Sequence, residues 1–410
     1  MFAILTTAET NMSFSINRAH LTYGIDLAKL TGIEIGPLVN PIVTRDQSNV
    51  KYVDRASTEE LREWYSKAPQ INVDEIMDID YIWGEQSLAE ATGSTEQFDY
   101  CIASHVIEHI PDLITWLQEI SSILNVGGVA CFAVPDKRYT FDYLRATTEA
   151  ADLIDNYLNK IRKPSFRHIY DHFSNFADLD ITAAWTPGFD GSNLVPKKTA
   201  AQAYARCFEA LNGDKYIDSH CSVFTEESFF DLLATISELG LLDFKIRRNF
   251  STNRRAFKFF VQLEKIDSSL SAEEKFSQLS QSLQTMKSTG LELTFTSNIA
   301  CEPKIYYHVG GGFNELEVMQ LEYSTPNQAS KLYFNLPQSN DIKLRFDPAD
   351  SQSEFQISEV RYHSANQVSD VPLDAFKPLK DIAKSTIERE SLHIQTTPNA
   401  NDPSFLIELN

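Results

Sequence analysis

The sequence predicts an α/β domain with a mostly parallel seven-stranded sheet, followed by an all-β sandwich. Short apolar segments alternate with helical patterns from residue 21 to about 137, as in parallel sheets covered by helices. Two further strand patterns lie at 242–247 and 256–263. From about Leu291, short alternating strands separated by Gly, Pro, Asn and Asp are typical of a sandwich.

The composition predicts a cytoplasmic, globular protein. The 410 residues suffice for two or three domains, and 42% of them are hydrophobic. The net charge of −21 disfavours binding to nucleic acid or anionic lipid. Five scattered cysteines without a CxxC pair indicate reduced thiols. The first 20 residues lack the basic region of a signal peptide, and no segment has the length of a membrane helix, so no membrane insertion is expected.

The apolar runs place the first five strands in order. The helix that follows the second strand begins at Ser57, and Glu60 completes a capping box. A second helical pattern, Asp112–Leu124, ends at the glycines of Asn125–Gly128. The predicted strands are Ile33–Ile35, Lys51–Asp54, Val73–Ile79 ending in Asp80, Phe98–Ser104 and Val129–Val134.

The region from about 138 to 220 interrupts this alternation. It is rich in Tyr, His and Phe and lacks strand patterns, which predicts a mostly helical insertion. A helix then runs from Thr225 to Leu239 and stops at Gly240. Because Ser228, not an acid or Gln, stands three residues after Thr225, no full capping box is expected there. The predicted domains are a leader (1–20), an α/β domain (21–265), a linker helix (266–289) and a sandwich (290–410).

A glycine turn after the first strand suggests a nucleotide site. GIEIGPLVNP, at Gly32–Pro41, is an apolar strand that ends in a turn, and Asp54 stands at the end of the next strand, placed to accept hydrogen bonds from ribose hydroxyls. A dinucleotide fingerprint needs more glycines than Gly36, and Pro37 removes a backbone donor. The turn therefore favours a nucleoside ligand without a pyrophosphate.

Together with Asp54, two motifs give the chain a family resemblance from Gly32 to Lys265. FDYCIASHVIEHIPD (Phe98–Asp112) and NVGGVACFAVPD (Asn125–Asp136) resemble the fourth and fifth strands of class I S-adenosylmethionine-dependent methyltransferases. The resemblance implies a Rossmann-like fold, S-adenosylmethionine as cofactor and methyl transfer as the activity. The first glycine loop departs from the family pattern at Pro37, Leu38 and Val39.

The resemblance also implies cofactor-binding residues. Glu34 and Gly36 match the contacts of the methionine end, and Asp54 matches the ribose acid. Asp80 and the following Tyr81 match the surroundings of adenine. At the tip of the fourth strand, Ser104 and His105 would lie beside the methyl group, where His105 is also a candidate catalytic residue.

Acceptor-side candidates follow the fifth strand and lie in the insertion. Asp136, a candidate base, and Arg138, a candidate ligand for a charged group, are either an acceptor site or a solvated charge cluster. On a helix, His168 and His172 share a face, which suits an acid/base role, an acceptor pocket or a metal; no metal is assigned. His109 is either structural or catalytic, and His220 is a further candidate. Tyr139 and Tyr170 complete the predicted acceptor site.

The C-terminal region gives a weaker resemblance, to β-sandwich modules of polysaccharide-modifying enzymes, through GGGFNELE (Gly310–Glu317) and LRFDPAD (Leu344–Asp350). This analogy suggests O-methylation of a sugar or glycan in surface polysaccharide synthesis, with a polysaccharide-synthesis enzyme or a second copy of the chain as partner. Methylation of a small metabolite, or a degenerate fold that only binds, are the alternatives.

Overall fold

The computed structural model describes residues 17–409, apart from 70, 85, 94, 96, 187, 214–215, 253–255, 309–312, 314–317, 322–323, 337–341 and 365–366. These residues form two compact units, one mainly up to Ser282 and one mainly from Leu283 onward. The two units are described separately. Among the described residues, no helix is long and apolar enough to cross a membrane. All five cysteines are buried and free.

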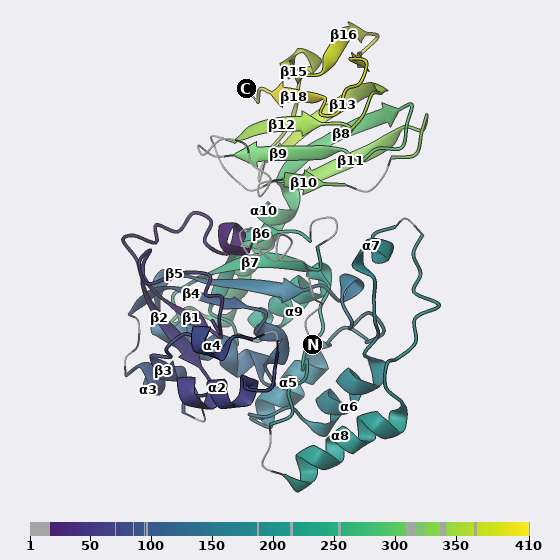
Figure 1. The fold of residues 1–410 in the computed structure, drawn as a ribbon. Helices are drawn as coiled ribbons and strands as arrows, with labels where there is room; N and C mark the ends of the chain where they lie inside the picture. Colours follow the sequence, from purple (N-terminus) through teal and green to yellow (C-terminus); the bar gives the residue numbers. More distant parts are fainter. Residues whose placement is uncertain are drawn as a thin grey trace. The chain divides into compact units, whose positions relative to one another are not determined.

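In the described part of the first unit, seven strands form one sheet in the order β3-β2-β1-β4-β5-β7-β6 (Figure 1). Strands β1 to β5 pair in parallel, whereas β7 is antiparallel to β5 and β6. The predicted Rossmann-like, mostly parallel sheet is confirmed. The strands are β1 Thr31–Ile35, β2 Asn49–Asp54, β3 Tyr81–Ile82, β4 Phe98–Ser104, β5 Leu124–Pro135, β6 Phe244–Phe250 and β7 Lys258–Lys265.

The strand order reverses between β1 and β4, so the chain leaves these neighbouring strands in opposite directions. Ligands of open α/β sheets bind at the carboxyl ends of the strands at this switch point. Ile35 pairs with both Val53 and Ala103, which aligns the ends of β1, β2 and β4. Because β7 is antiparallel, its first residue, Lys258, pairs with Pro135 and reaches the same edge.

Helices cover both faces of the sheet through aromatic contacts. On one face, Trp116 of α4 (Leu113–Ile123) packs against Phe132, with ring centroids 5.3 Å apart. Phe229 of α9 (Glu226–Glu238) packs on the same face of β7. On the opposite face, His20 stacks 4.3 Å from Phe250. These contacts bury the apolar strands on both sides, as a parallel sheet requires.

Two capping boxes show how short polar residues start the helices. In α2 (Thr58–Tyr65), Ser57 and Glu60 form the predicted box. In α9 the expectation of an incomplete box is wrong, because the hydroxyl of Ser228 accepts a hydrogen bond from the backbone of Thr225 at 2.9 Å. A serine hydroxyl can therefore replace the usual carboxylate at this position.

The third strand differs from its prediction. Val73–Ile79 is not a strand; it holds the 3₁₀ helix η1 (Val73–Glu75), where the side chain of Asn72 caps the turn. The Ile79 amide donates to the side chain of Thr58, and the paired residues are Tyr81–Ile82. The alternating acids thus mark a turn, and the register of β3 moves toward the C-terminus.

The insertion is helical, as predicted. Helix α6 (Phe166–Asn175) packs against α8 (Ala200–Asn212) through Ile169 and Cys207 (Figure 1). Its other helices are α5 Ala150–Leu158 and the short α7 Ile181–Ala184. The insertion ends in residues 216–223, which we call the strap. Among the described residues, the first unit also contains a short helix over 17–21, α3 Leu88–Thr92 and most of α10 Ala272–Ser288, where Lys275 pairs with Asp243 at 2.7 Å.

The described part of the second unit consists of two antiparallel sheets, as the strand pattern predicts. One has the order β10-β9-β12-β18-β15, and the other β11-β8-β13-β17-β16 with β14 beside β13. Buried phenylalanines, including Phe295 and Phe346, make edge-to-face contacts in its core. Of Gly310–Glu317, all but Phe313 lie outside the described residues. The strands are β8 Gly290–Ser297, β9 Lys304–His308, β10 Val318–Gln320, β11 Ser330–Asn335, β12 Lys343–Asp347, β13 Glu354–Ser364, β14 Gln367–Asp370, β15 Phe376–Lys380, β16 Ile382–Glu388, β17 Ser391–Thr396 and β18 Ser404–Ile407.

Candidate functional site

A buried carboxylate ties the segment after the glycine turn to β1. Gly36 has φ +70°, a left-handed conformation that favours glycine, and its amide donates to Val53 at 2.9 Å. Glu34 accepts from the amides of Ile42 and Val43 at 2.7 and 3.0 Å, and burial raises its pKa to about 7. Both Glu34 oxygens therefore bind the backbone of the segment that follows the glycine turn.

Asp54 lies at the carboxyl end of β2, where a ribose acid is expected. One carboxylate oxygen accepts from the Arg55 amide at 2.7 Å, and burial raises its pKa to about 6. A half-buried carboxylate of this kind suits two ribose hydroxyls, because each hydroxyl donates a hydrogen bond. Ile82, which pairs with Asp54, is 45% exposed and offers an apolar surface beside it.

Asp80, which the sequence predicts to lie beside adenine, makes contacts within the sheet. Asp80 stands before β3, at the amino end of the strand, and its side chain accepts from the Tyr52 amide at 2.8 Å and from Arg45 at 2.9 Å. It thus fastens the start of β3 to the middle of β2. Tyr81 begins β3, and Ile82 ends it. Trp83 follows, and its amide donates to the backbone carbonyl of Asp54 at 2.7 Å.

The tip of β4 carries a strained histidine beside a buried lysine. Ser104 ends the strand, and His105 has φ +56°, which is uncommon for a residue with a side chain. His105 Nε2 lies 3.1 Å from Lys258 Nζ, and its Nδ1 lies 3.5 Å from Glu108. Burial lowers the pKa of His105, and the charge of Lys258 lowers it further. Burial also lowers the pKa of Lys258 to about 7, although Glu108 opposes the shift.

The strap is anchored to the turn after β4. The Glu108 carbonyl, in the 3₁₀ helix η2 (Ile107–His109), accepts from the amides of Cys221 and Ser222 at 2.6 and 3.1 Å. His109 Nδ1 lies 2.8 Å from Asp218. Burial lowers the pKa of His109, but Asp218 and Glu108 outweigh it and raise the value to about 8. The strap thereby lies against the residues that follow the β4 tip.

A second set of contacts joins the strap to the insertion. His220 Nδ1 lies 2.5 Å from Asp142, and the His220 amide donates to His172 Nδ1 at 3.2 Å. Although burial raises the pKa of Asp142, the charges of His220 and Arg145 hold it well below its ordinary value. Burial lowers the pKa of His172 to about 3. The structure thus brings His172 to His220.

The strap also reaches the cofactor edge of the sheet. The Arg55 guanidinium lies over the Tyr216 ring, 3.4 Å from its centroid, and Arg55 directly follows Asp54. A cation–π contact at this distance ties the two segments together. The strap therefore links the insertion, the turn after β4 and the end of β2.

Asp136 and Arg138 form an internal pair. Asp136 is fully buried, and Arg138 donates to both of its oxygens, the shortest contact being 2.6 Å. Thr252 also donates to Asp136, at 3.1 Å. These contacts leave the carboxylate poorly placed to act as a base, which disfavours the acceptor-site hypothesis for the pair. Tyr139 stacks on Trp185 with ring centroids 3.9 Å apart.

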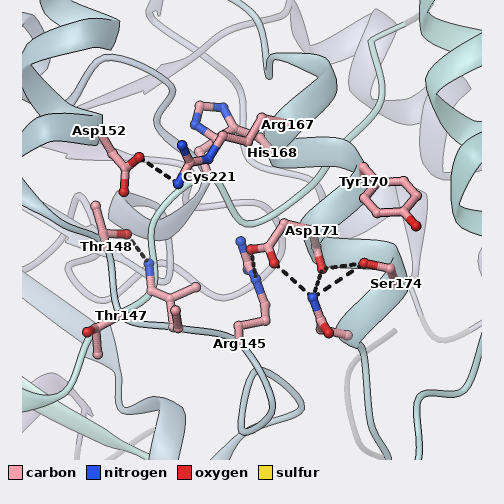
Figure 2. Close-up of a pocket in the computed structure, with 13 residues that line it drawn as sticks. Arg145, Thr147, Thr148, Asp152, Arg167, His168, Tyr170, Asp171, Ser174 and Cys221 are labelled. Atoms are coloured by element: carbon pink, nitrogen blue, oxygen red, sulfur yellow. Dashed lines mark hydrogen bonds and ion pairs between the residues drawn. The ribbon is translucent and has the colours of Figure 1, made fainter. Parts of the chain in front are cut away.

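A polar cavity of about 310 Å³ lies beside α6 (Figure 2). Arg145 extends from it to three partners, donating to Asp171 at 2.7 Å, to Asp142 at 2.8 Å and to the His220 carbonyl at 3.0 Å. His168 lines the cavity and accepts from the Ser165 amide as part of a capping box. Burial, aided by Arg145, lowers the pKa of His168 to about 4. The polar lining includes Arg145, Asp152, Arg167, Tyr170, Asp171 and Asn175.

Sequence reasoning missed several charged groups around the β4 tip and the strap. Lys258 carries a signal, since it is a lone charge inside the apolar run AFKFFVQL. Asp142 and Asp218 carry none, because they reach His220 and His109 only through the fold. Glu108 lies within the quoted motif, but its burial between two histidines is visible only in three dimensions.

A family model described as a methyltransferase domain matches residues 23–235. A search of curated proteins gave no match. Among solved structures, the chain is similar to a Rhodobacter sphaeroides protein provisionally described as a Zn-dependent alcohol dehydrogenase, with 13% identity over 60% of this chain and 88% of that one and a TM-score of 0.34.

Two proteins described as S-adenosylmethionine-dependent methyltransferases are also similar. The Listeria monocytogenes protein, provisionally so described, is 12% identical over 62% of this chain and 100% of its own, with a TM-score of 0.31. The Mesorhizobium loti protein is 12% identical over 61% of this chain and 96% of its own, with a TM-score of 0.31. These structural likenesses are too weak to carry an argument.

Proposed function

The chain belongs to the methyltransferase domain family, and from this premise we propose that it transfers a methyl group to a hydroxyl oxygen of a sugar or glycan. The cofactor is S-adenosylmethionine. Asp54 would hold its ribose, and Ile82 offers an apolar surface for its adenine. When bound, the cofactor supplies a methyl group on a positively charged sulfur, which an acceptor atom attacks in line.

The Lys258–His105 pair carries the proposal of a hydroxyl acceptor. A hydroxyl group has a high pKa, so it needs a nearby group that accepts its proton during attack. His105 at the β4 tip is 3.1 Å from Lys258, whose amine is neutral above a pH of about 7 because burial lowers its pKa. In this proposal the acceptor oxygen takes the methyl group, its proton passes to the neutral Lys258 amine, and His105 holds that amine at the β4 tip.

The polar cavity beside α6 supports a sugar as the acceptor class. Sugars present hydroxyl groups that donate and accept hydrogen bonds, and a C–H face that packs on aromatic rings. The cavity offers guanidinium, carboxylate and amide groups, and the ring of Tyr170 is 40% exposed at its rim (Figure 2). Arg145 connects this cavity to His220 of the strap.

The experiment that tests the proposal supplies methyl-labelled S-adenosylmethionine to the full-length protein with a fractionated host lysate. We expect label in the polysaccharide or lipid-linked sugar fraction with the natural protein, and none with the Asp54→Ala variant. Label confined to small non-sugar molecules, or to protein, contradicts the sugar acceptor. Label that Asp54→Ala retains in full contradicts the placement of the cofactor.

A further inference from the structure

We propose that Glu108, His109 and His220 bind a divalent transition-metal ion beside the β4 tip. One ligand atom from each of these three residues lies within 4.8 Å of the other two. They come from two segments far apart in the sequence, the turn η2 and the strap, which the amides of Cys221 and Ser222 hold together. Two imidazoles and one carboxylate are a common donor set for such ions.

Outer carboxylates fix the orientation of both imidazoles. Asp218 lies 2.8 Å from His109 Nδ1, and Asp142 lies 2.5 Å from His220 Nδ1. This leaves the Nε2 atom of each ring for a ligand, and His109 Nε2 is 4.0 Å from Glu108 Oε1. Metal-binding histidines usually have this arrangement, in which a carboxylate on one ring nitrogen raises the basicity of the other.

The buried carboxylate of Glu108 gives a separate reason to expect a cation. Its side chain is only 3% exposed, yet Oε2 has no hydrogen-bond partner among the described residues. A buried carboxylate oxygen without a partner is costly, because it has lost its water. The nearest ring nitrogens, on His105 and His109, are charged only when protonated. A divalent cation between Glu108 and the two Nε2 atoms would compensate the carboxylate.

Small side-chain movements would bring the three ligand atoms to metal-binding distance. Metal–ligand bonds of about 2.0–2.2 Å place the ligand atoms of a tetrahedral site roughly 3.3 Å apart. The atoms must therefore move by about 1 Å. Nitrogen ligands favour Zn²⁺, Co²⁺ or Fe²⁺ over Ca²⁺ and Mg²⁺, which prefer oxygen.

Three protein ligands leave at least one coordination position open. An acceptor hydroxyl in that position would lose its proton more readily, because a bound cation stabilises the alkoxide. This role rests on the proposed function. The binding of the ion does not, and is therefore tested without methyl transfer.

The experiment uses the full-length protein, stripped with EDTA and titrated with Co²⁺ or Zn²⁺. We expect one ion per chain, with Co²⁺ giving visible absorption bands that Zn²⁺ removes. Glu108→Gln, which keeps the side-chain shape, should weaken binding by at least about 100-fold. His168→Gln is the matched control, because this buried histidine lies outside the three ligands and glutamine preserves its capping contact. It should bind the ion as the natural protein does.

Asp218→Asn provides a variant that should keep the fold, since the Asp218 side chain is 69% exposed. It should weaken Co²⁺ binding by about 10- to 100-fold by releasing His109. Binding of S-adenosylhomocysteine and the unfolding temperature report that each variant is folded. The proposal is overturned if the natural protein binds no stoichiometric ion, or if folded Glu108→Gln and Asp218→Asn bind it unchanged. Metal binding without methyl transfer would contradict the proposed function alone.

Discussion

At the scale of single residues, the most consequential feature is a lysine inside the sheet. Lys258 is 5% exposed, and its amine touches His105 at the tip of β4. The rings of Phe257 and Phe260 lie within about 6 Å of the amine, and Glu108 is the acidic group that acts on it. An amine in such surroundings loses its charge near neutral pH, which is the property that a proton acceptor needs.

The first prediction concerns the pH dependence of methyl transfer. Because burial lowers the pKa of Lys258 to about 7, the amine is protonated below that pH and neutral above it. The rate constant should therefore rise with pH through about 7 and level off above it. Lys258→Met should lower kcat by roughly 10²- to 10⁴-fold and remove this rise, while S-adenosylhomocysteine binding is kept. A variant with an unchanged kcat and pH profile contradicts the role of Lys258.

A second prediction separates the two acids near the cofactor edge. Asp54→Ala should weaken S-adenosylhomocysteine binding by about 1.5–3 kcal/mol, roughly 10- to 100-fold, because the ribose hydroxyls lose a charged acceptor. Asp80→Ala is the matched comparison: its contacts with Tyr52 and Arg45 are structural, so it should change stability more than affinity. Isothermal titration calorimetry measures the affinity of both variants, and thermal unfolding measures their stability. A larger affinity loss in Asp80→Ala would restore the sequence-based assignment.

At the scale of elements, close packing of β1 on β4 depends on one glycine. A Cβ built on Gly32 would lie 2.1 Å from the Tyr100 ring, which is fully buried. Gly32→Ala should therefore lower the free energy of unfolding by about 1–3 kcal/mol, because the ring must move within a packed core. The control is Gly84→Ala, where the nearest atom is the end of the Gln86 side chain at 3.7 Å. Urea unfolding measures the difference, and equal midpoints for the two variants would refute the argument.

The strap yields a prediction of its own. Tyr216→Leu removes the ring beneath Arg55 and should weaken S-adenosylhomocysteine binding by about 0.5–2 kcal/mol, since Arg55 directly follows Asp54. Tyr204→Leu on α8 is the control, because Tyr204 is 57% exposed and lies outside the strap. Calorimetric titration of both variants is the measurement. If Tyr204→Leu loses as much affinity as Tyr216→Leu, the strap does not stabilise the cofactor edge.

Local patterns explain which elements the sequence predicts well. The run Val129–Val134 is apolar throughout, and Phe98–Ser104 is apolar apart from Asp99 and Ser104, because both faces of these central strands are covered; the two runs lie within β5 and β4. The prediction of the third strand fails because acidic and apolar residues alternate over Val73–Ile79 as they do in a strand, whereas the Asn72 side chain caps a 3₁₀ turn there. Alternation alone does not distinguish a half-buried strand from a capped turn.

At the scale of the whole molecule, the site depends on contacts across long stretches of sequence. Asp142 meets His220 over 78 residues, and Lys258 meets His105 over 153. Motif spacing predicts the positions of Asp54, Gly36 and the β4 tip at one edge of the sheet, because all three belong to one local α/β pattern. It does not predict the outer carboxylates, since nothing in the sequence near His109 or His220 indicates which acid will orient each ring.

The most direct test of the account is the identity of the atom that receives the methyl group. The measurement supplies ¹³C-methyl S-adenosylmethionine to the full-length protein with the labelled lysate fraction and reads the product by carbon NMR, which separates O-, N- and C-methyl groups. The account predicts a single O-methyl signal on a sugar, lost in Lys258→Met. An N-methyl or C-methyl product would contradict it, because those acceptors do not call for the proton-accepting pair at the tip of β4.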